Sequence, residues 1–222
     1  MATKQATHLP TVLRSPTHPI LLRTLEPRDA AAMSAVLSDP ENTKHDPHAS
    51  ALSPEVAAAV IGRMRESAAV PTVLDEASGR VASGPGRVNL LIVHVDGADN
   101  TLAASGDEGV GIGLGGFGGI DEHEEEGRGR VRVGDVGAMV NPGFRGRGFA
   151  TEAIRLAVEW AFTSVADGGP QFDRVTATMS EANKPMIGLV EKKLGWKGVV
   201  RPGKEGGGGE VVFEVGPESW RK

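Results

Sequence analysis

The chain has 222 residues, of which 39% are hydrophobic and 24% are charged, and a formal net charge of −5. This composition is typical of a single soluble globular domain and argues against nucleic-acid binding, which requires a clustered basic surface. The absence of cysteine excludes disulfides, thiolate metal ligands and a cysteine nucleophile. The longest apolar run, Val88 to Val95, is too short to cross a membrane, and the first residues lack an apolar segment of signal-peptide length. We therefore expect a cytoplasmic or nuclear protein without a membrane anchor.

The N-terminal segment differs from the rest of the chain. Residues 1–17 are polar, interrupted by proline and without hydrophobic periodicity, so we expect a flexible arm there. No internal repeat or linker divides the remaining sequence, and residues 18–222 are predicted to form one domain.

Helices are indicated where a capping signal precedes a suitable apolar pattern. Ser53 followed by Pro54 is typical of a helix N-terminus, because serine caps and proline fits the first helical position. Asn183 with Pro185 marks a later start, and Gly195 marks its end. The predicted helices cover residues 26–37, 53–69, 149–165 and 183–194.

Strands are indicated by short apolar runs and, in residues 109–120, by alternation of apolar residues with glycine. Three successive runs predict an antiparallel meander, and the fold class is mixed α/β. The segments 70–87 and 121–130 are predicted to be loops. The predicted strands cover residues 20–25, 88–95, 109–120, 131–140, 172–179 and 211–215.

The loop Gly-Phe-Arg-Gly-Arg-Gly at residues 143–148 lies between a predicted strand and a predicted helix. The first amides of a helix have no internal partners, and the helix dipole favours negative charge, so this loop predicts a site for a diphosphate. A Walker motif is excluded because Phe149 and Ala150 stand where lysine and a hydroxyl residue are required. The glycines at 111, 113 and 116 match a dinucleotide fingerprint, but they lie inside a predicted strand.

The segment Arg145-Gly146-Arg147-Gly148-Phe149-Ala150 matches the acyl-coenzyme A motif of the GNAT acetyltransferase superfamily. A second match runs from Asn183 to Leu194-Gly195-Trp196. On these motifs the chain resembles this superfamily over residues 20–215, and its details look most like the branch that acetylates ribosomal-protein N-termini. The resemblance implies a mixed, mainly antiparallel sheet with helices on both faces, and acetyl-coenzyme A as cosubstrate.

The same resemblance implies a set of site residues. The amides of the motif would hold the pyrophosphate of coenzyme A. Met139 and Val140 would offer backbone groups to the pantetheine and the thioester carbonyl, and Asn183 would contact the pantetheine arm. Asp135 lies where relatives often carry a glutamate, so it is the candidate catalytic base. The cofactor-binding candidates are Met139, Val140, Arg145, Gly146, Arg147, Gly148, Phe149, Ala150 and Asn183.

The chain departs from the family pattern in one respect, since it contains no tyrosine to protonate the leaving thiolate. Met186 and Ile187 occupy that region, which leaves water or Ser180 as proton donors. We expect direct transfer of acetyl to a primary amine, either a small molecule or a protein N-terminus. The alternative is a coenzyme A-binding module that has lost transfer. The sequence does not indicate an oligomeric state.

Two further signals have two interpretations each. The acidic residues 121–126 suggest either a metal cluster or a solvated surface that attracts a cationic amine, and we favour the surface. His94 is either a base or a structural histidine within the sheet, and we favour the structural role. No serine-hydrolase elbow is present in the sequence.

Overall fold

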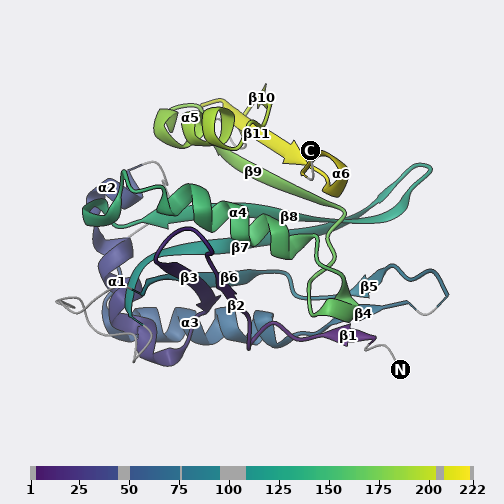
Figure 1. The fold of residues 1–222 in the computed structure, drawn as a ribbon, viewed down its shortest axis with the longest axis horizontal. Helices are drawn as coiled ribbons and strands as arrows, with labels where there is room; N and C mark the ends of the chain where they lie inside the picture. Colours follow the sequence, from purple (N-terminus) through teal and green to yellow (C-terminus); the bar gives the residue numbers. More distant parts are fainter. Residues whose placement is uncertain (1–3, 45–50, 76, 96–108, 204–207, 221–222) are drawn as a thin grey trace.

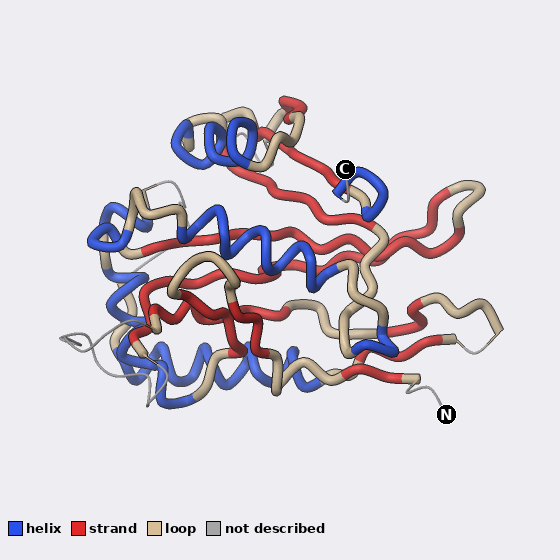
Figure 2. Tube along the Cα trace, viewed as in Figure 1, coloured by secondary structure: helices blue, strands red, loops and turns tan. Residues whose placement is uncertain are grey.

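The computed structural model describes residues 4–44, 51–75, 77–95, 109–203 and 208–220. Within these ranges, a sheet of eight strands runs in the order β10-β11-β9-β8-β7-β6-β3-β2, and a smaller sheet has the order β1-β4-β5. Figures 1 and 2 show the large sheet with α4 crossing it, α3 along a different side and α5 beside β9. The mixed, mainly antiparallel sheet agrees with the predicted class.

The described elements have the following bounds. The strands are β1 (Gln5–Ala6), β2 (Val12–Arg14), β3 (Ile20–Thr24), β4 (Thr72–Leu74), β5 (Val81–Ser83), β6 (Val88–His94), β7 (Val110–Glu125), β8 (Gly129–Val140), β9 (Arg174–Ser180), β10 (Gly198–Arg201) and β11 (Glu210–Val215). The α-helices are α1 (Ala30–Ser38), α2 (Pro40–Thr43), α3 (Pro54–Ala69), α4 (Phe149–Ala161), α5 (Lys184–Lys193) and α6 (Pro217–Trp220). Short 3-10 turns are η1 (Pro27–Asp29), η3 (Pro142–Phe144) and η4 (Val165–Asp167).

The predicted antiparallel meander is confirmed, because β6 pairs with β7 and β7 pairs with β8, both antiparallel. β6 is buried along most of its length, which explains why it reads as a continuous apolar run rather than as an alternating one.

The two faces of the sheet are covered by different helices. On one face, Leu21 and Leu91 pack in a cluster with Met33 of α1 and Ile61 of α3. On the other face, the amphipathic α4 contributes eight buried residues to a larger cluster. Because successive side chains of a strand point to opposite faces, β8 directs Val136, Ala138 and Val140 towards α4, and Asp135, Gly137 and Met139 away from it.

The strands β8 and β9 separate part-way along their length. They are parallel partners over only three residue pairs, ending at Asp135 and Thr176. Both strands continue beyond this point, β8 to Val140 and β9 to Ser180. Figure 1 shows the resulting V, closed where the strands pair and open towards the ends of both strands. The β9-facing backbone edge of β8 therefore has no strand partner over residues 138–140.

The expectation of a flexible arm over residues 1–17 is wrong for residues 4–17. β1 pairs with β4, and β2 pairs with β3 at the edge of the large sheet. His8, between them, is fully buried, and the Thr24 hydroxyl donates a hydrogen bond of 2.6 Å to its carbonyl. Short strands of this kind are held by pairing and by single buried side chains, which leave no periodic apolar pattern in the sequence.

Two predicted loops also contain strands. Residues 70–87 include β4 and β5, and residues 121–125 extend β7 into a hairpin with the start of β8. Two of the acidic side chains there form ion pairs with neighbouring strands: Glu122 with Arg130 and Arg132 of β8, and Glu125 with Arg174 of β9. The run therefore lies mostly in a strand and not in a loop, while most of its side chains are exposed, in agreement with the predicted acidic surface. The turn predicted directly after β6 lies outside the described residues.

Burial of His8 predicts acid sensitivity. Burial, followed by the nearby Arg132 charge, lowers the pKa of His8 to about 4. Histidine in the unfolded chain has the ordinary pKa of 6.5, so between pH 6.5 and pH 4 it binds a proton that His8 in the folded chain does not bind. The stability present above pH 6.5 is therefore lost as the pH falls towards 4. At pH 5 the loss is about 2 kcal/mol, from about 1.4 kcal/mol per pKa unit. Urea unfolding at pH 7 and pH 5 should show this loss in the wild type.

The matched variant is His8→Gln, which keeps a hydrogen-bonding group near Thr72 but does not titrate. It should be less stable at pH 7, because the ring contact with Trp160 at 5.4 Å is removed. It should also lack the additional loss at pH 5. An equal decrease with pH in both proteins would contradict the assignment to His8.

Candidate active site

The loop between β8 and α4 turns sharply at two glycines. Gly146 and Gly148 have φ angles of 76° and 82°, in the left-handed region that glycine adopts without strain. This turn brings the backbone into α4 at Phe149. The first amides of α4 have no intrahelical partners, and within the described chain no group accepts a hydrogen bond from the amides of Gly146, Arg147 or Gly148. The loop is therefore a concentration of unpaired donors at the positive end of a 13-residue helix.

The two arginines of the loop have different surroundings. The Arg145 guanidinium donates to the Val140 carbonyl at 3.0 Å and to the Asn42 side chain of α2 at 2.5 Å, and its own amide donates to Pro142. Arg145 therefore holds the shape of the loop, which corrects the expectation that its amide faces the pyrophosphate. Arg147 is exposed and lies 5.5 Å from the Phe144 ring.

Aromatic side chains pack beside both ends of the loop. The His94 ring lies 5.6 Å from the Phe144 ring and 5.4 Å from the Phe149 ring. This packing between two aromatic rings supports the structural interpretation of His94 rather than the catalytic one.

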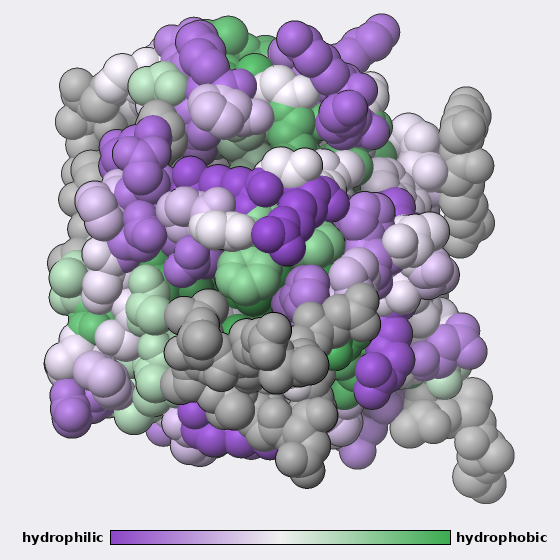
Figure 3. Space-filling view, turned by 60° about the vertical axis from the view of Figure 1, so that its left-hand side comes forward, coloured by the Kyte–Doolittle hydropathy of each residue, from purple (hydrophilic) through white to green (hydrophobic). Residues whose placement is uncertain are grey.

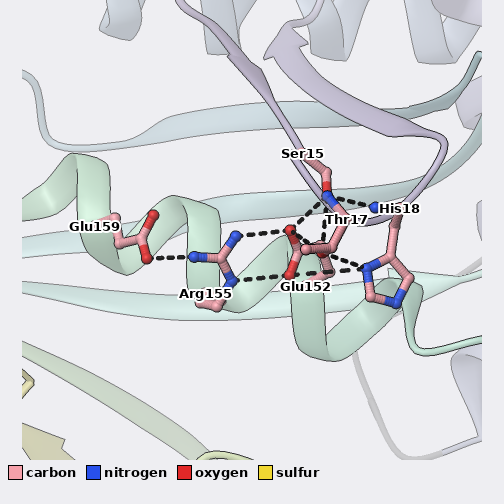
Figure 4. Close-up of polar contacts among 6 residues, drawn as sticks. All are labelled: Ser15, Thr17, His18, Glu152, Arg155 and Glu159. Atoms are coloured by element: carbon pink, nitrogen blue, oxygen red, sulfur yellow. Dashed lines mark hydrogen bonds and ion pairs between the residues drawn. The ribbon is translucent and has the colours of Figure 1, made fainter.

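A polar network fastens the turn between β2 and β3 to the first turns of α4, as Figure 4 shows. Glu152 is only 4% exposed, and its carboxylate accepts hydrogen bonds from Ser15 at 2.5 Å and from Arg155 at 2.7 and 2.8 Å. These bonds, with that of Arg155 the largest cause, lower the pKa of Glu152 to about 2 despite its burial. Sequence reasoning missed this network, because its partners lie more than 130 residues apart along the chain.

The register of β8 decides which of its backbone groups face the V. The Asn141 amide donates to Ile112 of β7 at 2.8 Å, so Asn141 and every second residue before it direct their backbone groups towards β7. The groups of Val140 and Ala138 consequently point towards β9, where the strands have separated. Met139 pairs with Leu114 of β7, so its backbone groups face β7 and not the V, contrary to the expectation for this residue. Besides Val140, the residue whose backbone groups face the V is Ala138, which sequence reasoning missed.

Asp135 lies at the closed end of the V. It is the last β8 residue paired with β9, and Thr176 Oγ1 donates a 2.9 Å hydrogen bond to its carboxylate. Burial raises the pKa of the Asp135 carboxyl, hydrogen bonds from Thr176 and Thr178 offset part of that rise, and the Asp121 charge adds to it. A carboxylate whose pKa is raised towards neutrality is better suited to accept a proton than a solvated one.

The sheet face that carries Asp135 has open space beside it. An added Cβ at Gly119 or Gly137 would meet nothing within 4 Å. Gly119 is the β7 partner of Asp135, and Gly137 is the next residue of β8 on the same face. Alternation along β9 places Thr176, Thr178 and Ser180 on this face as a row of hydroxyls. Asp135 itself is partly exposed, so a second reactant can approach it from this face.

The N-terminus of α5 flanks the other arm of the V. The Asn183 side-chain oxygen caps α5 by accepting from the Met186 amide at 3.3 Å, which leaves its NH₂ group as a donor. Met186 and Ile187 are half-buried and pack against the core, and neither side chain has a proton to donate. Figure 3 shows, from the side nearer this end, an apolar area with polar residues above it.

These features fit coenzyme A. Unpaired amides at the N-terminus of α4 suit its diphosphate, and the unpaired edge of β8 suits the amides of its pantetheine arm. A mixed sheet with splayed central strands, a glycine-rich loop before a helix and a carboxylate at the apex define an acyl-coenzyme A-dependent transferase. The chain belongs to the acetyltransferase (GNAT) domain family, whose model matches residues 20–197.

Known proteins agree with this assignment. A 68-residue segment is 40% identical to the N-acetyltransferase 9-like protein of Caenorhabditis briggsae; the match covers 30% of this chain and 32% of that protein, about a third of its length. Mycobacterium smegmatis RimJ in complex with CoA-disulfide has a TM-score of 0.64 at 17% identity, over 98% of this chain and 90% of that chain. Ribosomal-protein-S5-alanine acetyltransferase from Vibrio fischeri has a TM-score of 0.61 at 12% identity, over 96% and 100%.

The chain thus carries an acetyltransferase (GNAT) domain, and members of this family use acetyl-coenzyme A. The fold predicted from the resemblance is confirmed by the shared architecture of these structures. In the described part of the chain, no helix combines the length and hydrophobicity required to span a bilayer.

Proposed function

We propose that this acetyltransferase moves acetyl directly from acetyl-coenzyme A to an α-amine, with a protein N-terminus as the preferred acceptor and a small amine as the second. The observation that carries the proposal is the placement of Asp135. It lies at the closed end of the V with open space on one side, and the unpaired backbone of β8 leads from it to the glycine-rich loop.

The loop and the strand would divide the binding of the cosubstrate between them. The amides of Gly146, Arg147, Gly148, Phe149 and Ala150 would hold the diphosphate. Val140 and Ala138 would hold the pantetheine arm in the manner of an added strand, with the Asn183 NH₂ group as a further donor. When bound, acetyl-coenzyme A supplies the acetyl group as an activated thioester.

Asp135 would accept the proton that the amine loses as it attacks. An α-amine has an ordinary pKa of about 7.7 to 8.0 against about 10.4 for lysine, so an α-amine needs less assistance from a carboxylate base. The Ala138 amide, directed into the V, would stabilise negative charge on the carbonyl oxygen, an effect of about 3 to 4 kcal/mol for one such donor. The hydroxyls of Thr178 and Ser180 are the candidate proton donors to sulfur in place of the missing tyrosine.

Two observations support a protein N-terminus as acceptor. The space above Gly119 and Gly137 leaves the backbone of the sheet accessible to an extended chain beside Asp135. Among the structural neighbours, the Vibrio fischeri enzyme is named for the alanine of ribosomal protein S5. Asp121, on the same face, would attract the positively charged amine before it loses its proton.

The proposal is tested with matched peptides and acetyl-coenzyme A, with products identified by mass spectrometry. One peptide begins with alanine and carries an internal lysine; its partner has the same sequence with a blocked N-terminus. We expect acetylation of the first peptide at its α-amine and none of the second. Modification of lysine in both would contradict an α-amine acceptor. Binding of acetyl-coenzyme A without transfer to any peptide or small amine would favour a binding module.

A further inference from the structure

We infer that His18, in the turn between β2 and β3, is an additional ligand of the coenzyme A diphosphate. This rests on the proposed binding of the diphosphate at the N-terminus of α4, and it adds a side chain from the N-terminal segment to a site otherwise built from backbone amides. No sequence motif includes this residue, which lies 130 positions before Gly148.

The His18 ring is held in place from several sides. Its Nδ1 lies 2.9 Å from Thr17 Oγ1 and 3.9 Å from a carboxylate oxygen of Glu152, as drawn in Figure 4. The ring meets the Phe149 ring edge-on at 6.1 Å, and the His18 amide donates to Ser15 Oγ at 2.9 Å. A histidine in an ordinary surface turn has no need of this support.

The ring directs its second nitrogen at the glycine-rich loop. An added Cβ at Gly148 would lie 2.8 Å from His18 Nε2, nearer than to the ring carbons Cδ2 at 3.5 Å and Cε1 at 3.7 Å. Within the described residues Nε2 has no hydrogen-bond partner, and the side chain is 33% exposed. His18 Nε2 therefore faces Gly148, whose amide is one of the unpaired amides of the loop.

This arrangement suits an anion. An imidazole N–H at Nε2 donates a hydrogen bond, and in the protonated ring that bond to phosphate is charge-assisted. The Arg145 guanidinium of the loop already donates to Val140 and Asn42. His18 therefore supplies a side-chain donor in addition to Arg145.

The test compares two ligands that differ in the diphosphate. Coenzyme A carries it and pantetheine does not, and both dissociation constants are measured by NMR titration of wild type and His18→Phe. Phenylalanine keeps the ring packing against Phe149 but cannot donate. We expect coenzyme A to bind at least about tenfold more weakly to the variant, the lower end for a charge-assisted hydrogen bond, with pantetheine unchanged. His123→Phe, on the exposed end of the β7–β8 hairpin, is the matched control and should bind both ligands as the wild type does.

A second variant tests whether a weaker affinity of His18→Phe results from misfolding. His18→Lys restores a cationic donor and should recover coenzyme A affinity towards that of the wild type. Equal weakening for both ligands in His18→Phe, or unchanged coenzyme A affinity, would overturn the role of His18. If the wild type does not bind coenzyme A at all, the proposed site itself is wrong. If the wild type binds coenzyme A and His18→Phe binds it equally well, only the role of His18 is wrong.

Discussion

Asp135→Asn should lower kcat by about 10²- to 10⁴-fold, the range for loss of a positioned general base, while leaving the dissociation constant for acetyl-coenzyme A nearly unchanged. Asparagine is close to isosteric with aspartate and can accept the 2.9 Å hydrogen bond from Thr176, so the strand pairing at the apex of the V is retained. Steady-state kinetics with a peptide acceptor, together with calorimetric titration of acetyl-coenzyme A, measures both quantities. A kcat within a few-fold of the wild type would remove Asp135 from the chemistry.

Thr176→Val is the matched control, because it changes the pKa of the same carboxyl without removing it. The Thr176 hydrogen bond lowers the pKa of Asp135 and opposes the effect of burial, so its loss should raise that pKa further. A base must be ionised to act, and activity that rises with pH through this pKa should therefore begin at higher pH in the variant. The profile of kcat/KM against pH should move to higher pH on its acidic side, with a maximum near that of the wild type. A move to lower pH would contradict this role of the hydrogen bond.

Gly148→Glu should weaken acetyl-coenzyme A binding by more than about 100-fold. Gly148 has a φ of 82°, which a residue with a side chain adopts at a strain of roughly 1 to 2 kcal/mol. The new side chain would also meet His18 Nε2 at 2.8 Å and place a carboxylate among the amides proposed to bind the diphosphate. Calorimetric titration measures the loss, and circular dichroism monitors the fold.

Gly62→Glu is the control for added negative charge. Gly62 is exposed on α3, and a Cβ there meets nothing within 4 Å, so this variant should bind acetyl-coenzyme A as the wild type does. Wild-type affinity in Gly148→Glu would show that the loop is an ordinary turn.

The parts of the site that could be predicted from the sequence are local. Gly146 and Gly148 are predictable because a sharp turn before a helix requires glycine at positive φ. Asp135 is predicted from the family resemblance, because relatives often carry a glutamate at this position of the strand that leads to the turn. The meander formed by β6, β7 and β8 was predicted because apolar runs and alternation specify strands directly.

The parts that could not be predicted depend on pairing between distant segments. Which backbone groups of β8 face the V follows from its register with β7, and a shift of one residue would exchange Ala138 for Met139. The accessible space beside Asp135 depends on Gly119 of the neighbouring strand. The N-terminal segment was taken for a flexible arm because β1 and β2 are stabilised by their partners rather than by an apolar pattern of their own.

The most direct test of the central claim is a crystal structure of the protein with bound coenzyme A. The diphosphate should accept hydrogen bonds from the amides of Gly146 to Ala150, and the pantetheine arm should lie along Val140 and Ala138 with its sulfur near Asp135. A diphosphate bound elsewhere, or a pantetheine arm outside the V between β8 and β9, would contradict the account.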